Sequence, residues 1–175
     1  MKSHNALRYS AGLIMSLTLL TACGYHVTGA TRKLPGGIQS LGIPAFKNLT
    51  REYKLEQQIT AAVLKEFVTR TRVPVNSQST DVDAVLEGEI HSVNASPITY
   101  GTDTFASAYL VTVEMSVKLV RLKDGSVLFE NPGFTFQERY VLNTTITQFF
   151  SEENSALDRL ARDFAASLAS AVLSR

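Results

Sequence analysis

Cysteine is almost absent from this sequence, since Cys23 is the only one among 175 residues. Disulfide bonds within the chain are therefore excluded, and its fold has to be stabilised by packing alone. An excess of charge of one sign is also lacking, because 17 basic side chains stand against 16 acidic ones. A chain without a basic excess has no field that attracts nucleic acid, so we expect no nucleic-acid partner.

Long hydrophobic runs are lacking too. The run from Ala11 to Leu20 has about half of the roughly 20 residues that a membrane-spanning helix needs. It follows the basic residues Lys2 and Arg8 and precedes the small pair Thr21-Ala22. This order is typical of a cleaved export signal. We therefore predict a signal peptide over residues 1–22 and no second membrane segment.

The stretch Leu20-Thr21-Ala22-Cys23 brings the only cysteine directly behind that signal. It is similar to the lipobox of bacterial lipoproteins, in which the thiol is acylated and the peptide bond before it is cut. A chance free cysteine is the alternative, but exported chains rarely keep an odd thiol without a use for it. Several acyl chains on one residue hold a protein firmly to a membrane. We predict lipidation of Cys23, followed by a tether over residues 23–37.

Gly24 bears on which membrane would hold the chain. The retention signal of inner-membrane lipoproteins in enterobacteria has Asp directly after the lipidated cysteine. Because Gly24 stands at that position, resemblance to the sorting rule favours the outer membrane. The expected location is the periplasmic face of the cell outer membrane, with the chain anchored by lipid.

Residues 38–175 are predicted to form a single α+β domain. Alternating apolar residues and short apolar runs between turn formers indicate strands. The segment from Ile38 to Phe46 is expected to form a strand that ends near Pro44, and further strands are expected over residues 82–93, 109–119 and 127–141. Residues 94–104 have the composition of a loop. The order of strands and helices suggests two helices packed on one face of a mainly antiparallel sheet of about four strands.

Two apolar stripes at helical spacing indicate the helices. The first stripe is Leu55, Ile59, Ala62, Val63 and Phe67, and the second is Leu157, Leu160, Phe164, Leu168 and Val172. Asn48 or Thr50 is expected to cap the first helix, and Val73-Pro74 to stop it. The second helix is expected to begin at Ser151. Both stripes are predicted to lie on the core.

The turn Lys123-Asp124-Gly125 is predicted to join the two longest antiparallel strands. A three-residue loop there pairs Leu119 with Phe129 and Arg121 with Val127, which keeps apolar residues together. We therefore expect a three-residue hairpin with Gly125 in the left-handed region.

Asn131-Pro132-Gly133 interrupts the return strand of that hairpin. Phe134 and Phe136 then fall on the opposite parity from Phe129. A shift of register at the interruption would bring them back to the same face, so we predict a shift there.

The search for chemistry gives a negative result. His26 and His91 are separated by loop and strand, and no set of residues has the spacing of a zinc site. Glu87 and Glu89 share a strand face and could act as a general acid and base, but the solvent side of an alternating strand explains them better. We therefore predict no catalytic residue, metal or cofactor, and a protein that is not an enzyme.

Two short motifs resemble the LptE family of lipopolysaccharide-assembly lipoproteins. One is Cys23-Gly24-Tyr25-His26, and the other is Ile43-Pro44-Ala45-Phe46-Lys47-Asn48-Leu49-Thr50 leading into Leu55-Glu56. The likeness extends in order over nearly the whole chain after residue 22. It implies an outer-membrane lipoprotein that sits as a plug inside the β-barrel of its partner LptD. It also implies help with assembly of that barrel and contact with lipopolysaccharide on its way to the cell surface.

One departure from the family concerns the lipopolysaccharide contact. Members of the family carry basic residues before the long strand and before the last helix, where this chain has Gly101-Thr102-Asp103 and Phe149-Phe150. The remaining basic candidates for ligand binding near the sheet are Arg121, Lys123 and Arg139. The alternative for these three is a role as solvated surface residues.

A second reading belongs to another class of protein. The phrase from Pro44 to Thr50 also resembles the strand-to-helix junction of small envelope lipoproteins that regulate a cell-wall synthase or form part of a secretion channel. The first reading requires a β-barrel partner, and the second a synthase or a ring of copies of the chain.

Overall fold

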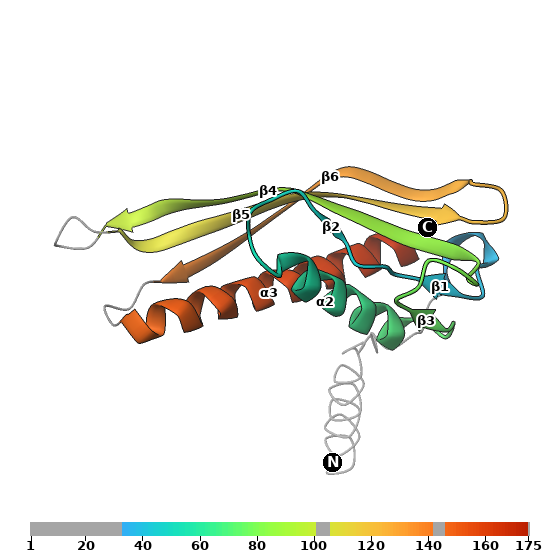
Figure 1. Ribbon diagram of the computed structural model, residues 1–175, viewed down its shortest axis with the longest axis horizontal. Coiled ribbons are helices and arrows are strands. Elements are labelled where there is room, and N and C mark those ends of the chain that lie inside the picture. Colours follow the sequence, from blue (N-terminus) through green and yellow to red (C-terminus); the bar gives the residue numbers. More distant parts are fainter. Residues whose placement is uncertain (1–32, 101–105, 142–145, 175) are drawn as a thin grey trace, which may run out of the picture. The chain divides into compact units, whose positions relative to one another are not determined.

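Two helices lie on one side of a mixed sheet in the computed structural model (Figure 1). The structure describes residues 33–100, 106–141 and 146–174. The short turn η2 (Pro35–Gly37) is followed by helices α2 (Leu55–Arg70) and α3 (Ile146–Leu173). The strands are β1 (Leu41–Gly42), β2 (Lys47–Asn48), β3 (Val75–Asn76), β4 (Ala84–Tyr100), β5 (Ala106–Arg121) and β6 (Val127–Val141).

The strand order is β3-β1-β4-β5-β6, and β2 also pairs with β4. The α+β class with two helices is confirmed, but within the described residues the sheet has six strands rather than about four. It is also mixed, because β1, β2 and β3 pair in parallel whereas the three long strands pair antiparallel. The strand expected to end near Pro44 is reduced to β1, and β2 follows at Lys47 on the same edge of β4. Pro44 lies between them and has no N–H for a continuous ladder.

Strand β4 continues through residues that were expected to form a loop. Asn94 pairs with Thr112, and Pro97 with Tyr109. The parallel pairing on the other edge of β4 ends at Ile90, opposite Asn48. In this half of β4, Pro97 therefore occupies an edge strand, where the missing N–H costs little. Cross-strand pairing has overridden the loop composition.

The core lies between the sheet and the two helices. Both predicted stripes face it: Leu55, Ile59, Val63 and Phe67 of α2 are buried, as are Leu160, Phe164, Leu168 and Val172 of α3. From the sheet it receives Leu86 and Ile90 of β4 and Val111, Val113, Met115, Val117 and Leu119 of β5. The buried residues Ala161, Ala165 and Ala169 have small side chains, which allow α3 to approach closely.

The helix starts differ from those expected. Helix α2 begins after Lys54, which has a left-handed backbone, and neither Asn48 nor Thr50 caps it. Asn48 instead binds the loop before the helix, with its amide nitrogen 2.8 Å from the Glu52 carbonyl oxygen. Helix α3 starts at Ile146, so Ser151 lies inside the helix rather than at its cap. No glycine or proline precedes Ser151 within the helix, so nothing in those residues breaks it.

Gly88 of β4 receives the ring of Phe46, which crosses from the β1–β2 connection to the helix side of the sheet. A Cβ atom at Gly88 would overlap that ring. The Phe46 ring also meets Phe164 of α3 edge to face, with centroids 6.3 Å apart. Its backbone N–H donates to Thr60 Oγ1 of α2 at 2.9 Å. One side chain therefore joins the edge of the sheet to both helices.

The hairpin between β5 and β6 has one more loop residue than expected. Arg121 N–H donates to the Ser126 carbonyl, which leaves Leu122–Gly125 as the loop. Gly125 has the predicted positive φ of 70°. Val127 therefore pairs with Val120, not with Arg121. An irregularity after this pair restores the predicted pairing of Leu119 with Phe129.

The register shift predicted at Asn131-Pro132-Gly133 is confirmed. Asn131 pairs with Val117, and Phe134 with Met115, so Pro132 and Gly133 together oppose Ser116. The bulge turns Phe134 and Phe136 towards the helices, where both meet Phe164 edge to face, at 5.8 and 5.1 Å between centroids.

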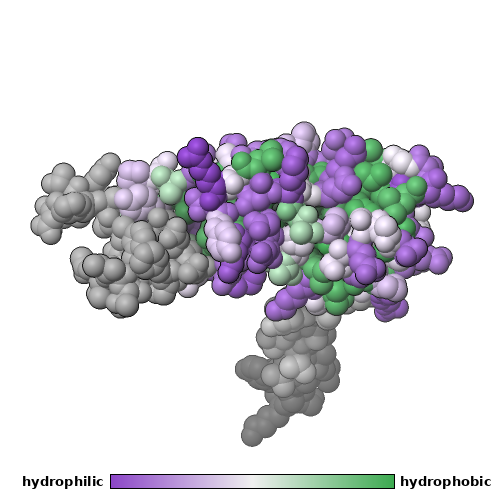
Figure 2. All heavy atoms as spheres, in the orientation of Figure 1, coloured by the Kyte–Doolittle hydropathy of each residue, from purple (hydrophilic) through white to green (hydrophobic). Residues whose placement is uncertain are grey.

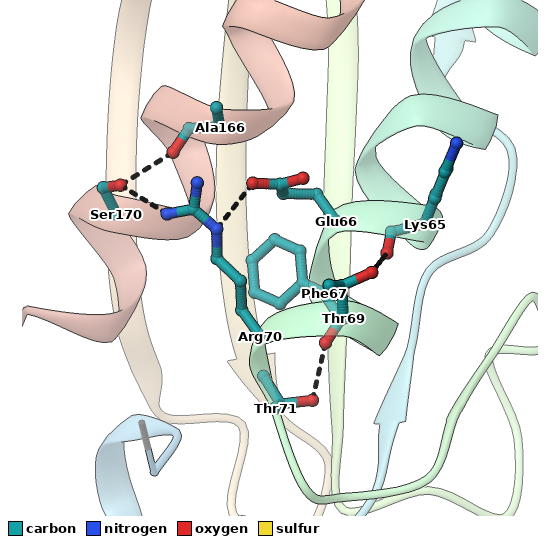
Figure 3. Close-up of polar contacts among 8 residues, drawn as sticks. All are labelled: Lys65, Glu66, Phe67, Thr69, Arg70, Thr71, Ala166 and Ser170. Atoms are coloured by element: carbon teal, nitrogen blue, oxygen red, sulfur yellow. Dashed lines mark hydrogen bonds and ion pairs between the residues drawn. The ribbon is translucent and has the colours of Figure 1, made fainter. Parts of the chain in front are cut away.

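Polar contacts also join the two helices (Figure 3). Arg70 of α2 donates from Nη1 to Ser170 Oγ of α3 at 2.9 Å, and its Nε pairs with Glu66. The Ser170 hydroxyl in turn donates to the Ala166 carbonyl. The end of α2 is closed by Thr71, whose N–H and hydroxyl both donate to the Phe67 carbonyl. In the described part of the chain, no helix has the length and apolar character needed to cross a membrane.

The contact at Gly88 gives a testable prediction. Gly88→Val is expected to lower the free energy of unfolding by about 2 kcal/mol or more, because the new side chain must displace the Phe46 ring from a packed core. Gly133→Ala is the matched control, since open space surrounds Gly133, and its effect is expected to stay within about 0.5 kcal/mol. Urea denaturation of the purified variants measures both. Equal stabilities would show that the Phe46 contact is unimportant.

Candidate functional site

The face of the sheet opposite the helices is polar. Register places Glu87 of β4, Lys118 of β5 and Glu130 of β6 in one row across three strands. Parallel rows hold Glu114, which accepts from Ser92 Oγ at 3.1 Å, and Thr112. The solvent-side position predicted for Glu87 and Glu89 is thus confirmed, with Glu87 exposed and Glu89 partly so. We call this surface the outer face.

Two bulges lie side by side near the middle of the outer face. Ile90 pairs with Met115 and Ser92 with Glu114, so His91 is an extra residue in β4. In the neighbouring strand, Ser116 lies opposite the Pro132–Gly133 bulge of β6. The His91 ring reaches Ser116, with Nε2 2.9 Å from its Oγ. Bulges redirect side chains and bend strands, and they often occur beside functional sites.

A groove of about 600 Å³ lies over these bulges. Its polar contacts centre on Glu89, which pairs with Lys47 Nζ at 3.1 Å and lies 3.5 Å from His91 Nδ1. The groove is lined by Pro44, Ala45, Lys47, Glu87, Gly88, Glu89, His91, Ser116, Val117, Lys118, Glu130, Asn131 and Pro132. Charges of both signs therefore alternate along one open surface.

The groove is suited to binding rather than to catalysis. Glu89 is held by Lys47, so it is not poised beside Glu87 as one member of an acid–base pair. Among the described residues, no group of three or more His, Cys, Asp and Glu side chains could hold a metal ion. Exposed donors and acceptors of both charges instead match a polar surface of another molecule. Sequence reasoning missed this site, because nothing in the alternating pattern of β4 marks His91 as a bulge.

Arg121 and Lys123, two of the predicted ligand-binding residues, line a second depression of about 550 Å³ at the β5–β6 hairpin. Arg121 is committed to a structural contact, since its Nη2 donates to the Gly36 carbonyl at 2.8 Å. Its Nη1 also lies 3.5 Å from Asp124 Oδ2. Lys123 is exposed at the tip of the hairpin.

The tip of this hairpin is organised by a carboxylate. The Ser126 hydroxyl and the Ser126 N–H donate to Asp124 Oδ1 at 2.6 and 3.0 Å. These hydrogen bonds, with a smaller contribution from the nearby Arg121 charge, lower the pKa of Asp124 below its ordinary value. Asp124 therefore serves the turn, and the depression presents the basic side chains of Arg121 and Lys123 together with the carboxylate of Asp83.

Arg139 does not join the other two candidates. It is exposed on β6 opposite Leu110, whereas Arg121 ends β5 eleven positions further along that strand. At about 3.3 Å per residue, this separates the two sites by roughly 36 Å. The three basic residues cannot contact one small ligand group. Cys23, Gly101-Thr102-Asp103 and Phe149-Phe150 lie outside the residues whose side chains the structure describes.

The surface has no large continuous apolar area in the view of Figure 2, where hydrophobic patches are broken up by hydrophilic ones.

Solved bacterial proteins share the fold. Protein XCC0632 of Xanthomonas campestris, from family DUF330, has a TM-score of 0.56 at 11% identity, over 82% of this chain and 86% of that one. Lipoprotein B of Nitrosomonas europaea has a TM-score of 0.53 at 12% identity, over 83% and 87%. PelC of Paraburkholderia phytofirmans, a dodecamer, has a TM-score of 0.52 at 14% identity, over 78% and 89%.

These structures define the class of fold: an α+β domain with two helices on one sheet. A sequence comparison identifies the family within this class of fold. The family model for LptE, described as lipopolysaccharide-assembly, matches residues 38–172. The chain belongs to the LptE family, as the two short motifs suggested. No curated protein sequence matches the chain.

Two alanine substitutions distinguish the roles of Arg121 and Lys123, the two basic residues of the hairpin. Arg121→Ala is expected to lower the free energy of unfolding by about 1 kcal/mol, because the Gly36 carbonyl loses its charged donor. Lys123→Ala is expected to change it by less than about 0.5 kcal/mol, since the side chain is exposed. Urea denaturation compares the two. If Arg121→Ala leaves the free energy of unfolding unchanged, the contact with Gly36 is unimportant and Arg121 is again a candidate for ligand binding.

Proposed function

We propose that the chain is an outer-membrane lipoprotein that sits inside an LptD-like β-barrel, assists assembly of that barrel and takes part in lipopolysaccharide insertion at the cell surface. The observation that carries the proposal is the LptE family match over residues 38–172. Membership of this family associates the chain with lipopolysaccharide assembly, and the closer description of partner and position is our inference.

The outer face supports a position inside a barrel. A plug has to present a polar surface, because the interior of a large membrane barrel is polar and wet. The row formed by Glu87, Lys118 and Glu130 and the paired Lys47 and Glu89 meet that requirement. The helices lie on the other side of the sheet and bury the apolar core, so the outer face remains available.

The proposal includes a lipid anchor at Cys23 with a tether over residues 23–37, placed after a signal peptide over residues 1–22. It is supported by the lipobox-like stretch ending at Cys23. The domain of residues 38–175 would then act as a non-enzymatic partner held at the periplasmic face of the outer membrane. For direct contact with lipopolysaccharide, Lys123 is better placed than its hairpin neighbour Arg121, because Arg121 is bonded to Gly36. Arg139 is exposed as well and is a separate candidate on β6.

The alternative is a small envelope lipoprotein that regulates a cell-wall synthase or forms part of a secretion channel. The shared fold with PelC, which is solved as a dodecamer, is the observation that keeps this reading open. It predicts a ring of copies or a synthase partner instead of a barrel.

Depletion of the chain from its own cells tests the proposed function. Correctly assembled LptD-like barrel and surface lipopolysaccharide are expected to fall together, because the barrel loses its assembly partner. Semi-denaturing electrophoresis of outer membranes and labelling of surface lipopolysaccharide measure the two quantities.

The control for this experiment is re-expression of the intact chain, which should restore both quantities. Intact-mass measurement of the restored protein should show acyl chains on Cys23. If barrel and surface lipopolysaccharide stay normal while cell-wall synthesis falters, the regulator reading replaces the proposal.

A further inference from the structure

The loop between β2 and α2, residues 49–54, exposes apolar side chains that the core does not use. Tyr53 is 86% exposed, the highest value among the large hydrophobic side chains that the structure describes. Leu49, four residues earlier, is 51% exposed. Arg51 and Lys54 lie in the same loop and are exposed as well. We call residues 49–54 the docking loop.

The docking loop has a fixed backbone. Asn48 Oδ1 accepts from the N–H and the hydroxyl of Thr50, at 2.9 and 2.7 Å. Asn48 Nδ2 donates to the Glu52 carbonyl and to Glu56 Oε2 of α2, both at 2.8 Å. The Thr50 hydroxyl also accepts from the Glu52 N–H at 3.1 Å. The loop is thus tied to the strand before it and to the helix after it.

The end of the docking loop is strained. Lys54 has a φ of 64°, in the left-handed region that residues with a side chain rarely adopt. Its ammonium group lies over the Tyr53 ring, 5.0 Å from the ring centroid, as in a cation–π contact. Strained backbone that the surrounding structure maintains is concentrated at binding and switch sites. The strain here accompanies an aromatic ring held towards solvent.

From these features we propose that the docking loop inserts Tyr53 and Leu49 into an apolar hollow of a partner protein, rimmed by carboxylates that meet Arg51 and Lys54. The inference rests on the proposed function, and it assigns the hollow to the barrel partner. Interface hot spots are enriched in Tyr and Arg and are surrounded by side chains that exclude water. A loop already fixed in its bound form loses little conformational freedom on binding.

A protein hollow fits the docking loop better than a lipid surface does. Only Leu49 and Tyr53 would enter the membrane, and the attraction of Arg51 and Lys54 to anionic headgroups would be partly offset by the exposed Glu52 between them. The hydrogen bonds of Asn48 hold the backbone of the docking loop in one conformation. A protein pocket with a defined shape can match that conformation, whereas a fluid lipid surface cannot. Binding to lipid is therefore the competing outcome of the experiment.

The test is recovery of the barrel with the full-length lipidated chain after extraction in mild detergent. The double variant Leu49→Ser, Tyr53→Ser is expected to recover about tenfold less barrel than the wild type. The control is Leu122→Ser, Val127→Ser, which removes two apolar side chains at the β5–β6 hairpin that are 47% and 46% exposed, and it should recover barrel as the wild type does. Urea midpoints of both double variants should equal that of the wild type, since all four side chains are exposed.

The outcomes separate the two proposals. If the wild type and the docking-loop variant recover barrel equally, the inference is overturned and the proposed function stands. If the wild type recovers no barrel, both are overturned.

Flotation of a Cys23→Ser chain with vesicles of phosphatidylethanolamine and phosphatidylglycerol covers the lipid alternative. Flotation that is lost in the docking-loop variant would make the loop a membrane contact and overturn the inference.

Discussion

The contact between the Phe46 ring and Gly88 is the constraint on which both layers of the domain depend. Because Gly88 has no side chain, the ring can pack closely against β4 and reach Phe164 of α3. The same residue is bonded through its N–H to Thr60 of α2. The β1–β2 connection is thereby held at the sheet edge, the helices stay on one side, and the outer face is left uncovered.

Much of the inner layer could be predicted from the sequence, because burial on one face imposes a strict period on β5 and on both helices. Gly88 could be placed on the inner side of its strand, but not matched with Phe46, because that contact joins segments far apart in the chain. The continuation of β4 through Pro97 depends on pairing with β5. The left-handed backbone of Lys54 depends on the hydrogen bonds that Asn48 makes to the loop. Of the candidate site, the exposed glutamates and the bulge at Pro132 were predictable, the latter from the interruption Asn131-Pro132-Gly133. The groove also depends on the bulge at His91, which has no local signal.

The domain therefore presents two kinds of surface that serve one proposed role. The outer face offers mixed charges over a broad area, which suits a wet barrel interior and fixes orientation more than affinity. The docking loop offers a small apolar centre with basic neighbours, which suits a single strong contact. The basic candidates at the hairpin contribute less than their charges suggested, since Arg121 is bonded to Gly36.

The most direct test of this account is photocrosslinking from the outer face in intact cells. A photoreactive phenylalanine analogue in place of Glu114, an exposed residue of β5, samples the molecule that covers this face. The account predicts crosslinks to residues of an LptD-like barrel that point into its lumen, identified by mass spectrometry. Crosslinks to a cell-wall synthase or to other copies of this chain, with none to a barrel, would contradict it.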